Sequence, residues 1–306
     1  MTSVDERAVC QPLYGTIPHP YGAYMDTSPT LPEVVRLAAA YFESAGVAFT
    51  LLDGCVVADG GEYPLTNLSQ KLAAIPARQW PEATADHFGA IREVTARLEF
   101  PKDYDSARSG LRVRLVEDER PIQFQSWPLR DRICAGLSRQ LMTKVEGGAV
   151  SVPPDLLETW NTSADQVWAA ALDNTLGESP KVRLLGKNSG ERMVMITGNF
   201  WASSHLLGLD RYLSSGSGYG AAACVPTNDV LLIHEITGPD FMESAVELTT
   251  LATHLFHDGP QSVSPHLYWW NEGGVQRIVE STSDGTTVPT WDRSFSRMLA
   301  RMERTA

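Results

Sequence analysis

Cys224-Val-Pro-Thr-Asn-Asp-Val-Leu-Leu-Ile-His-Glu-Ile236 is the stretch that decides the predicted fold of this chain. Two apolar runs, residues 221–225 and 229–236, flank Pro226-Thr-Asn228. Proline presets the backbone angle of a bend, and asparagine tolerates turn conformations. The segment therefore predicts a β-hairpin that turns at Pro226-Thr-Asn228.

Two more hairpins are predicted along the chain. Residues 47–52 and 55–58 flank Asp53-Gly54, a dipeptide whose easy positive φ angles permit a tight turn. Residues 264–270 and 275–280 flank the glycine-containing turn Asn271-Glu-Gly-Gly274. Strand alternation predicts a further strand at residues 111–116, because apolar and polar residues alternate there.

Helices are predicted between the hairpins. Thr30 and Glu33 form a capping-box pattern at the start of a helix over residues 31–45, and Ser163 and Gln166 do so for a helix that ends at Gly177. The remaining predicted helices are residues 65–75, 81–98, 202–213, 239–257 and 292–304, and two further strands are predicted at 181–186 and 191–197. Within residues 121–150, both a helix at 133–141 and a strand at 141–145 fit the sequence.

Hairpins separated by helices predict an α+β fold, with mainly antiparallel sheets built from β-hairpins and helices packed on one side. Residues 1–29 are proline-rich and lack periodicity, so we expect an irregular N-terminal arm. Val152-Pro-Pro-Asp155 is typical of a joint. We therefore expect an N-terminal α+β subdomain at residues 30–150 and a C-terminal α+β domain at 151–306.

The order of these patterns resembles the YtpQ-like family of uncharacterised bacterial proteins over residues 33–280. The segments that carry the resemblance are 224–236 and Ser264-Pro-His-Leu-Tyr-Trp-Trp-Asn-Glu-Gly273, with residues 33–58, 64–76 and 155–176 in support. The resemblance implies a fold and a cytoplasmic location. It implies no catalytic residues, because none are established for the family.

The composition disfavours several classes of function. The 306 residues carry a formal net charge of −12, which works against binding to nucleic acid. Asp5, Glu6 and Arg7 stand where a secretory signal would have its apolar core, and no apolar run reaches the ~18 residues of a membrane span. We therefore expect a cytoplasmic protein that binds neither nucleic acid nor membranes, and whose partner is a small-molecule ligand or another protein. Formation of a homo-oligomer stays open.

No metal or cofactor site is predicted. Cys10, Cys55, Cys134 and Cys224 lie far apart, with no Cys-x-x-Cys pair. The glycine-rich run at residues 214–220 follows a helix and precedes a strand, whereas phosphate-binding loops lie between a strand and a helix. This run is more typical of a connector.

Three histidine-containing patterns are candidates for chemistry. His254 and His257 could share a metal, but they lie opposite the apolar stripe of their helix, which favours a solvated face. Ser203-Ser-His205 places hydroxyls beside an imidazole without the nucleophile-elbow pattern of a serine hydrolase. His234 and Glu235 end an apolar strand and are the best-placed candidates for acid–base catalysis, although their side chains must point to opposite faces. The alternative for this pair is a strand that emerges into solvent.

The candidate substrate-binding residues are mostly aromatic. His266, Tyr268 and Trp270 share one face of a predicted strand, which would suit a flat or cationic ligand or, alternatively, core packing. Trp201 adds another aromatic ring, and Arg114 is a further candidate on the polar face of residues 111–116.

Two hypotheses of function follow from these patterns. The first is a cofactor-independent enzyme of small-molecule metabolism, which carries out an acid–base-assisted condensation or cyclisation on an aromatic or amine-bearing substrate. The alternative is a non-catalytic interaction protein of regulatory or immunity type.

Overall fold

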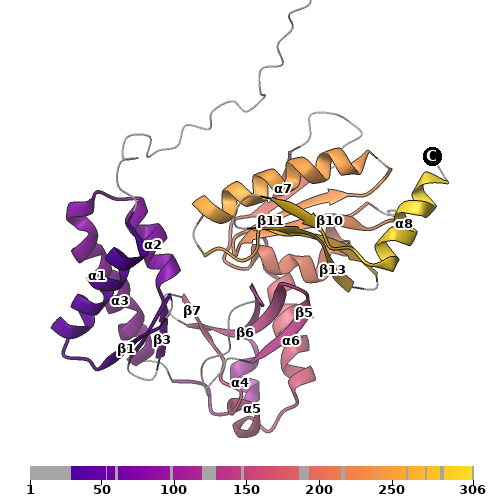
Figure 1. The fold of residues 1–306 in the computed structure, drawn as a ribbon. Coiled ribbons are helices and arrows are strands. Elements are labelled where there is room, and N and C mark those ends of the chain that lie inside the picture. The colour runs from indigo at the N-terminus through magenta and orange to yellow at the C-terminus, as the bar shows by residue number, and fades with distance from the viewer. Residues whose placement is uncertain are drawn as a thin grey trace, which may run out of the picture. The chain divides into compact units, whose positions relative to one another are not determined.

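The computed structural model describes residues 29–52, 54–58, 61–96, 99–118, 129–145, 148–185, 193–214, 218–238, 240–259, 261–272, 274–282 and 286–304. The chain has an α+β fold with antiparallel sheets, as predicted (Figure 1). Its contacts divide it into two compact units, one that ends at Gly89 and one that begins at Ala90. Apart from Pro29, the predicted N-terminal arm lies outside the described residues.

The first unit packs helices against a small antiparallel sheet. Its elements are α1 (Leu31–Ser44), β1 (Phe49–Leu52), β2 (Cys55–Ala58), β3 (Gly61–Pro64), α2 (Leu65–Ala73), η1 (Ala77–Gln79) and the start of α3 (Trp80–Ala96). The capping box at Thr30 and Glu33 is confirmed, since the Thr30 N–H donates to Glu33 Oε2 over 2.8 Å. The first hairpin is also confirmed, and Gly54 supplies the positive φ of +67° that its turn requires.

The second unit contains a small sheet in which β6 is the central strand. Its elements are α4 (Tyr104–Arg108), β4 (Leu111–Val116), β5 (Arg130–Cys134), β6 (Leu137–Val145) and β7 (Gly148–Ser151). β6 pairs with β4, β5 and β7, always antiparallel. The helix that the sequence allowed at residues 133–141 is wrong, because those residues form most of a β5–β6 hairpin.

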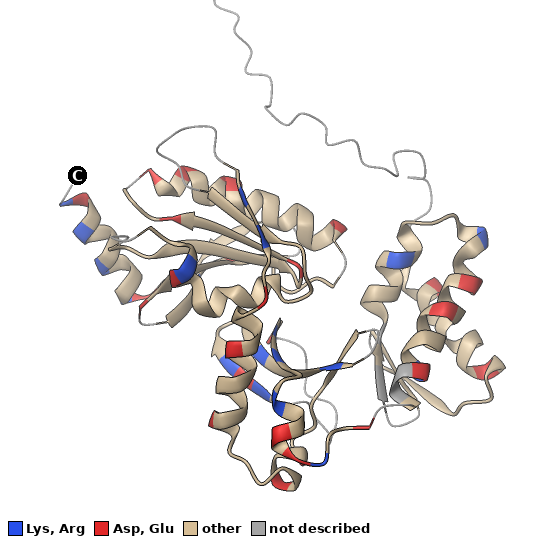
Figure 2. Ribbon diagram, turned by 180° about the vertical axis from the view of Figure 1, so that it is seen from behind, with Lys and Arg blue, Asp and Glu red and all other residues tan. Residues whose placement is uncertain are grey.

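The expected domain boundary at residue 150 falls inside the second unit. α5 (Leu156–Thr159) and α6 (Ala164–Leu176) pack on β4 and β6, so that Val113 and Leu141 share one core with Val167. Arg112 and Lys144 both form ion pairs with Glu178. Figure 2 shows several basic residues along the small sheet. The Val152-Pro-Pro-Asp155 segment therefore joins elements of one core.

The larger sheet of the second unit has seven antiparallel strands among the described residues, in the order β14-β13-β12-β10-β11-β9-β8. Their bounds are β8 (Lys181–Leu184), β9 (Met193–Thr197), β10 (Ala221–Thr227), β11 (Val230–Glu235), β12 (Leu267–Asn271), β13 (Gly274–Ser281) and β14 (Thr287–Pro289). β10 pairs with β11, and β12 pairs with β13, which confirms the second and third predicted hairpins.

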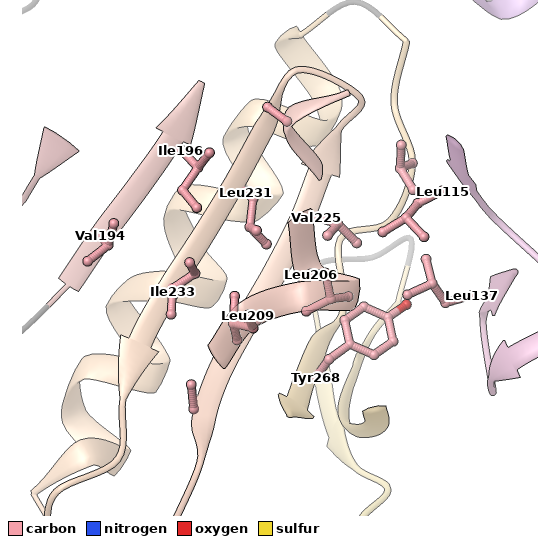
Figure 3. Close-up of a cluster of buried hydrophobic side chains, with 14 residues drawn as sticks. Leu115, Leu137, Val194, Ile196, Leu206, Leu209, Val225, Leu231, Ile233 and Tyr268 are labelled. Atoms are coloured by element: carbon pink, nitrogen blue, oxygen red, sulfur yellow. The ribbon is translucent and has the colours of Figure 1, made fainter. Parts of the chain in front are cut away.

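Both faces of the central strands of this sheet are buried. On one face, α7 (Phe241–Asp258) and α8 (Arg293–Glu303) cover strand residues such as Leu232 and Trp269, as predicted for helices on one side. The other face packs on the helical segment η2 (Ala202–Tyr212) and on the small sheet. Figure 3 shows this second core, where Leu115 and Leu137 of the small sheet approach Tyr268.

The expected turn at Pro226 is wrong. Pro226 lies inside β10, and the chain turns at Asn228 and Asp229 instead. The pairing of β10 with β11 shifts register between Cys224 and Thr227, where the missing N–H of proline costs no ladder hydrogen bond. The Thr227 hydroxyl donates to Asp229 Oδ1 over 2.7 Å and closes the turn.

The helix predicted at residues 202–213 forms, but as 3₁₀-type η2 with a non-helical residue at Gly208.

Within the described part of the chain, no helix is both long and apolar enough to cross a membrane.

Candidate functional site

A large cavity of the second unit is a groove along α8, with a volume of about 970 Å³. We call it the α8 groove. One wall is α8 itself, and the second wall is the end of the β12–β13 hairpin at Trp270, Asn271 and Glu272. The third wall combines Asp210 of η2, residues 213–214 directly after η2, and the turn at residues 218–220. The groove thus draws on segments from residue 210 to residue 304.

The sequence of α8 explains how it presents one charged face. Asp292 caps the helix, because its Oδ1 accepts the N–H groups of Ser294 and Phe295 over 2.6 and 3.2 Å. The Ser294 hydroxyl also donates to Asp292 Oδ1, and this hydrogen bond, together with the two from the backbone, lowers the pKa of Asp292. Phe295, Met298 and Met302 are buried, which orients the helix on the sheet.

Three arginines line the groove from this helix. Arg297, Arg301 and Arg304 are spaced by four and three residues, so they follow one side of the helix. The Arg301 guanidinium lies 5.0 Å from the centre of the Tyr219 ring and donates to the Gly218 carbonyl over 2.6 Å. Arg297 and Arg304 make no ion pair with any other described residue. Figure 2 shows that basic residues recur along the last helix, near the C-terminus.

Close backbone packing forms the base of the groove. Gly220 has a φ of +79°, and a Cβ atom there would meet the Trp270 carbonyl oxygen at 2.1 Å. The Trp269 indole N–H donates to the Tyr219 carbonyl over 2.8 Å. Only glycine fits at position 220 without displacing the strand beside it.

The two predicted catalytic residues are separated by β11. His234 lies on the face covered by α7, and Glu235 lies on the face covered by η2, as strand alternation predicts. Each is only 4% exposed, so the alternative of a strand that emerges into solvent is wrong. Neither lines the α8 groove. Glu235 nevertheless supports it, because its carboxylate oxygens accept the Ser214 N–H over 3.1 and 3.2 Å, and Ser214 is part of the third wall.

Of the three substrate-binding candidates on β12 and just before it, Trp270 lines the groove, whereas His266 and Tyr268 do not. The Tyr268 hydroxyl lies 2.8 Å from Ser264 Oγ, and His266 Nδ1 accepts the Ser281 N–H over 3.1 Å. Both side chains are buried, and burial raises the pKa of Tyr268 far above its ordinary value. They belong to the packed interior, which is the alternative that the sequence left open for this strand.

Trp201 and Arg114 both lie beside Phe200. Trp201 is 4% exposed and packs edge-on against Phe200, with ring centres 4.8 Å apart. The Arg114 guanidinium lies 5.3 Å from the Phe200 ring, and its Nε–H donates to Asn228 Oδ1 over 3.2 Å. Neither residue lines the α8 groove.

The remaining histidine patterns give no reactive centre. His205 is fully buried with Nδ1 2.6 Å from the Tyr212 hydroxyl, and burial, followed by the charge of Arg211, lowers its pKa. Ser203 and Ser204 are each 1% exposed, so no substrate could reach them in this conformation. His254 and His257 are exposed, and no group of three potential metal ligands occurs among the described residues.

The arginines of the groove are absent from the sites predicted from sequence, although a signal for them exists. The segment at residues 292–304 has the pattern of an amphipathic helix, and its arginines recur on one side of it. What the helix would face depends on the β12–β13 turn and on residues 213–220, which sequence spacing does not reveal.

Comparisons with models of known families, with curated proteins and with solved structures gave no significant match. The resemblance to the YtpQ-like family therefore stays a prediction.

Proposed function

We propose that this chain binds a small aromatic molecule that carries an acidic group, and that the α8 groove is the binding site. The observation that carries the proposal is the pair Arg297 and Arg304, which line the groove and pair with no described acidic residue. In a chain with a net charge of −12, this is a local concentration of positive charge. Guanidinium groups bind carboxylate and phosphate through two parallel hydrogen bonds, which favours an anionic ligand.

The size and the other walls of the groove support an aromatic ligand. A volume of about 970 Å³ lies at the upper end of the range of small-molecule sites. Trp270 and Tyr219 supply ring surfaces, and the carboxylates of Asp210 and Glu272 could accept hydrogen bonds from an amine on the same ligand.

The chemistry predicted from the sequence stays a proposal for this ligand. A condensation or cyclisation in the α8 groove would draw its acid and base from Asp210 and Glu272, because His234 and Glu235 do not line it. Glu235 would then be a positioning residue. Membership of the YtpQ-like family, supported by the order of hairpins and helices, and a cytoplasmic location belong to the same proposal.

The test uses two ligands of nearly the same shape, one with a charged carboxylate and one with a neutral amide in its place. 2-Naphthoate and its neutral analogue 2-naphthamide are titrated against the full chain by isothermal calorimetry. We expect saturable binding of naphthoate at one site and binding of naphthamide at least tenfold weaker. In the Arg297→Gln variant, naphthoate should also bind about tenfold more weakly, because a hydrogen bond to a charged group contributes about 1.5–3 kcal/mol.

Arg293→Gln is the matched control, since Arg293 is an exposed arginine of the same helix that does not line the groove. It should bind naphthoate like the unmodified chain. Equal binding of the two naphthalene ligands, or equal losses in both variants, would contradict an anion site here. A chain that binds neither ligand would favour the alternative of a protein-interaction function.

A further inference from the structure

A second cavity of about 490 Å³ lies beside α7. We call it the α7 pocket. One wall is the side of α7 that carries Ala245, Val246 and three threonines. The opposite wall consists of strand residues such as Leu267 and Ile278, with the rings of Trp291 and Phe295 completing it. The whole pocket lies within the second unit.

The α7 pocket is uncharged. No lysine, arginine, aspartate or glutamate occurs among the described residues that line it, and its one titratable side chain is the exposed imidazole of His254. Its rim is apolar as well, since Val246 is 67% exposed and Met242 is 42% exposed. An anion in this pocket would lose its hydration without gaining a cationic partner, which is costly.

The threonines make the pocket more apolar than their side chains suggest. Thr249, Thr250 and Thr253 each donate their hydroxyl hydrogen to the carbonyl four residues earlier in α7, over 2.8, 2.9 and 2.9 Å. With these donors occupied, the threonines offer a ligand only methyl groups and oxygen lone pairs. The helix wall can therefore accept a hydrogen bond but cannot donate one from a threonine.

We propose that the α7 pocket binds a neutral, mainly apolar small molecule whose polar part is a hydrogen-bond donor, such as a hydroxyl or an amine. The volume lies within the range that encloses small ligands. The apolar walls supply affinity by removing ligand surface from water. The occupied hydroxyls of α7 give no hydrogen-bond donor to a ligand whose only polar groups are acceptors, which leaves Thr287 and His254, at other points of the lining, to supply one. This inference does not depend on the α8 groove.

The probe is N-phenyl-1-naphthylamine, a neutral aromatic amine whose fluorescence rises in apolar surroundings. Titration of the full chain should give saturable binding at one site. Thr253→Trp places an indole in the pocket and should weaken this binding at least tenfold, and Val246→Trp, at the exposed rim, is the second variant. Arg297→Gln should leave the binding unchanged.

Glu247→Trp is the matched control, because Glu247 is exposed on α7 and does not line the pocket. It should bind the probe like the unmodified chain. Circular dichroism and thermal midpoints identify which variants are folded. Loss of binding in folded Glu247→Trp, or full binding in both folded pocket variants, would overturn the proposal.

Two further measurements distinguish a neutral small molecule from an anionic ligand and from a second copy of the chain. 1-Anilinonaphthalene-8-sulfonate has the same rings as the probe plus a negative charge, and its binding should not depend on Thr253→Trp. An equal loss for both dyes would overturn the selection against anions. If the unmodified chain elutes as a dimer and Thr253→Trp as a monomer, the pocket belongs to a second copy and the proposal fails.

Discussion

The α8 groove and the α7 pocket border the same helix and differ in almost every property that a ligand would meet. The groove presents three arginines and two carboxylates, whereas the described lining of the pocket has none of these. The groove is built from turns and a helix face, and the pocket is built mainly from one helix and a sheet face. The same amphipathic helix thus contributes arginines to the lining of one cavity and Phe295 to the lining of the other.

The difference shows that contact with α8 alone does not determine whether a cavity is charged or apolar. Arg297 and Arg301 alternate along the helix with buried Phe295 and Met298. The element opposite α8 determines the polarity of each cavity. The β12–β13 turn brings polar side chains to the α8 groove, and α7 brings methyl groups to the α7 pocket. Changes on either partner element should therefore affect one site and spare the other.

The largest effect is expected from a substitution of Phe295, which packs between the two cavities. Phe295 is fully buried, and its ring centre lies 5.2 Å from that of Trp269 and 5.7 Å from that of Trp291. Phe295→Ala should lower the free energy of unfolding by about 3–5 kcal/mol and weaken both naphthoate and the neutral dye. Chemical denaturation and the two titrations measure this. Ser296→Ala, at the next and exposed position, should change stability by less than about 0.5 kcal/mol.

A backbone change should separate the sites. Gly220→Ala forces a side chain against the Trp270 carbonyl at a positive φ, so we expect a loss of about 2–4 kcal/mol in unfolding free energy. Naphthoate binding should fall, and binding of the neutral dye should persist below the new unfolding midpoint. Gly218→Ala is the control, because a Cβ atom at that position would meet no described atom within 4 Å. Parallel losses of both ligands in Gly220→Ala would mean that the two cavities are not separate.

Glu235→Gln tests the support behind the groove. The substitution keeps the shape but removes the charge that the Ser214 N–H meets, so stability should fall by about 1–2 kcal/mol. Naphthoate should bind several-fold more weakly, whereas the affinity of the neutral dye should stay within twofold. Glu243→Gln, at an exposed position of α7, should leave both affinities unchanged. An unchanged naphthoate affinity in folded Glu235→Gln would remove its positioning role.

The smallest expected effect sharpens the description of the α7 pocket. Thr253→Val replaces a hydroxyl whose hydrogen is already donated to the Thr249 carbonyl. The affinity of the neutral dye should therefore change by no more than about twofold, since a ligand loses only an acceptor of modest net strength. Fluorescence titration is sufficient to detect a larger change. A tenfold loss would show that binding depends on the acceptor oxygen of Thr253 more than on the apolar walls.

Local signals in the sequence predicted most elements. The capping boxes at Thr30 and Ser163 gave the helix starts correctly, because both residues that make each box are close in sequence. Strand alternation placed Tyr268 and Trp270 on one face of their strand, for the same reason. Pro226 misled the prediction, since a register shift lets a proline stay inside a strand.

The candidate site was less predictable, because it depends on contacts between distant segments. His234 and Glu235 were assigned to opposite faces correctly, but their burial follows from α7 and η2, which cover the two sides of β11. Of the aromatic candidates, only Trp270 reaches the groove, since it lies at the end of β12. Arg297 and Arg304 come from the last helix, and they line a cavity only because lining residues between 210 and 220 lie opposite them.

Phe295 has a thermodynamic consequence for the two cavities. Its ring forms part of the α7 pocket and packs on Trp269, which forms part of the α8 groove. If a ligand in one cavity shifted this ring, the affinity of the other cavity would change, and heterotropic linkage requires the factor to be the same in both directions. An uncharged ligand in the α7 pocket would then alter the affinity of the α8 groove for the proposed acid through a single aromatic side chain.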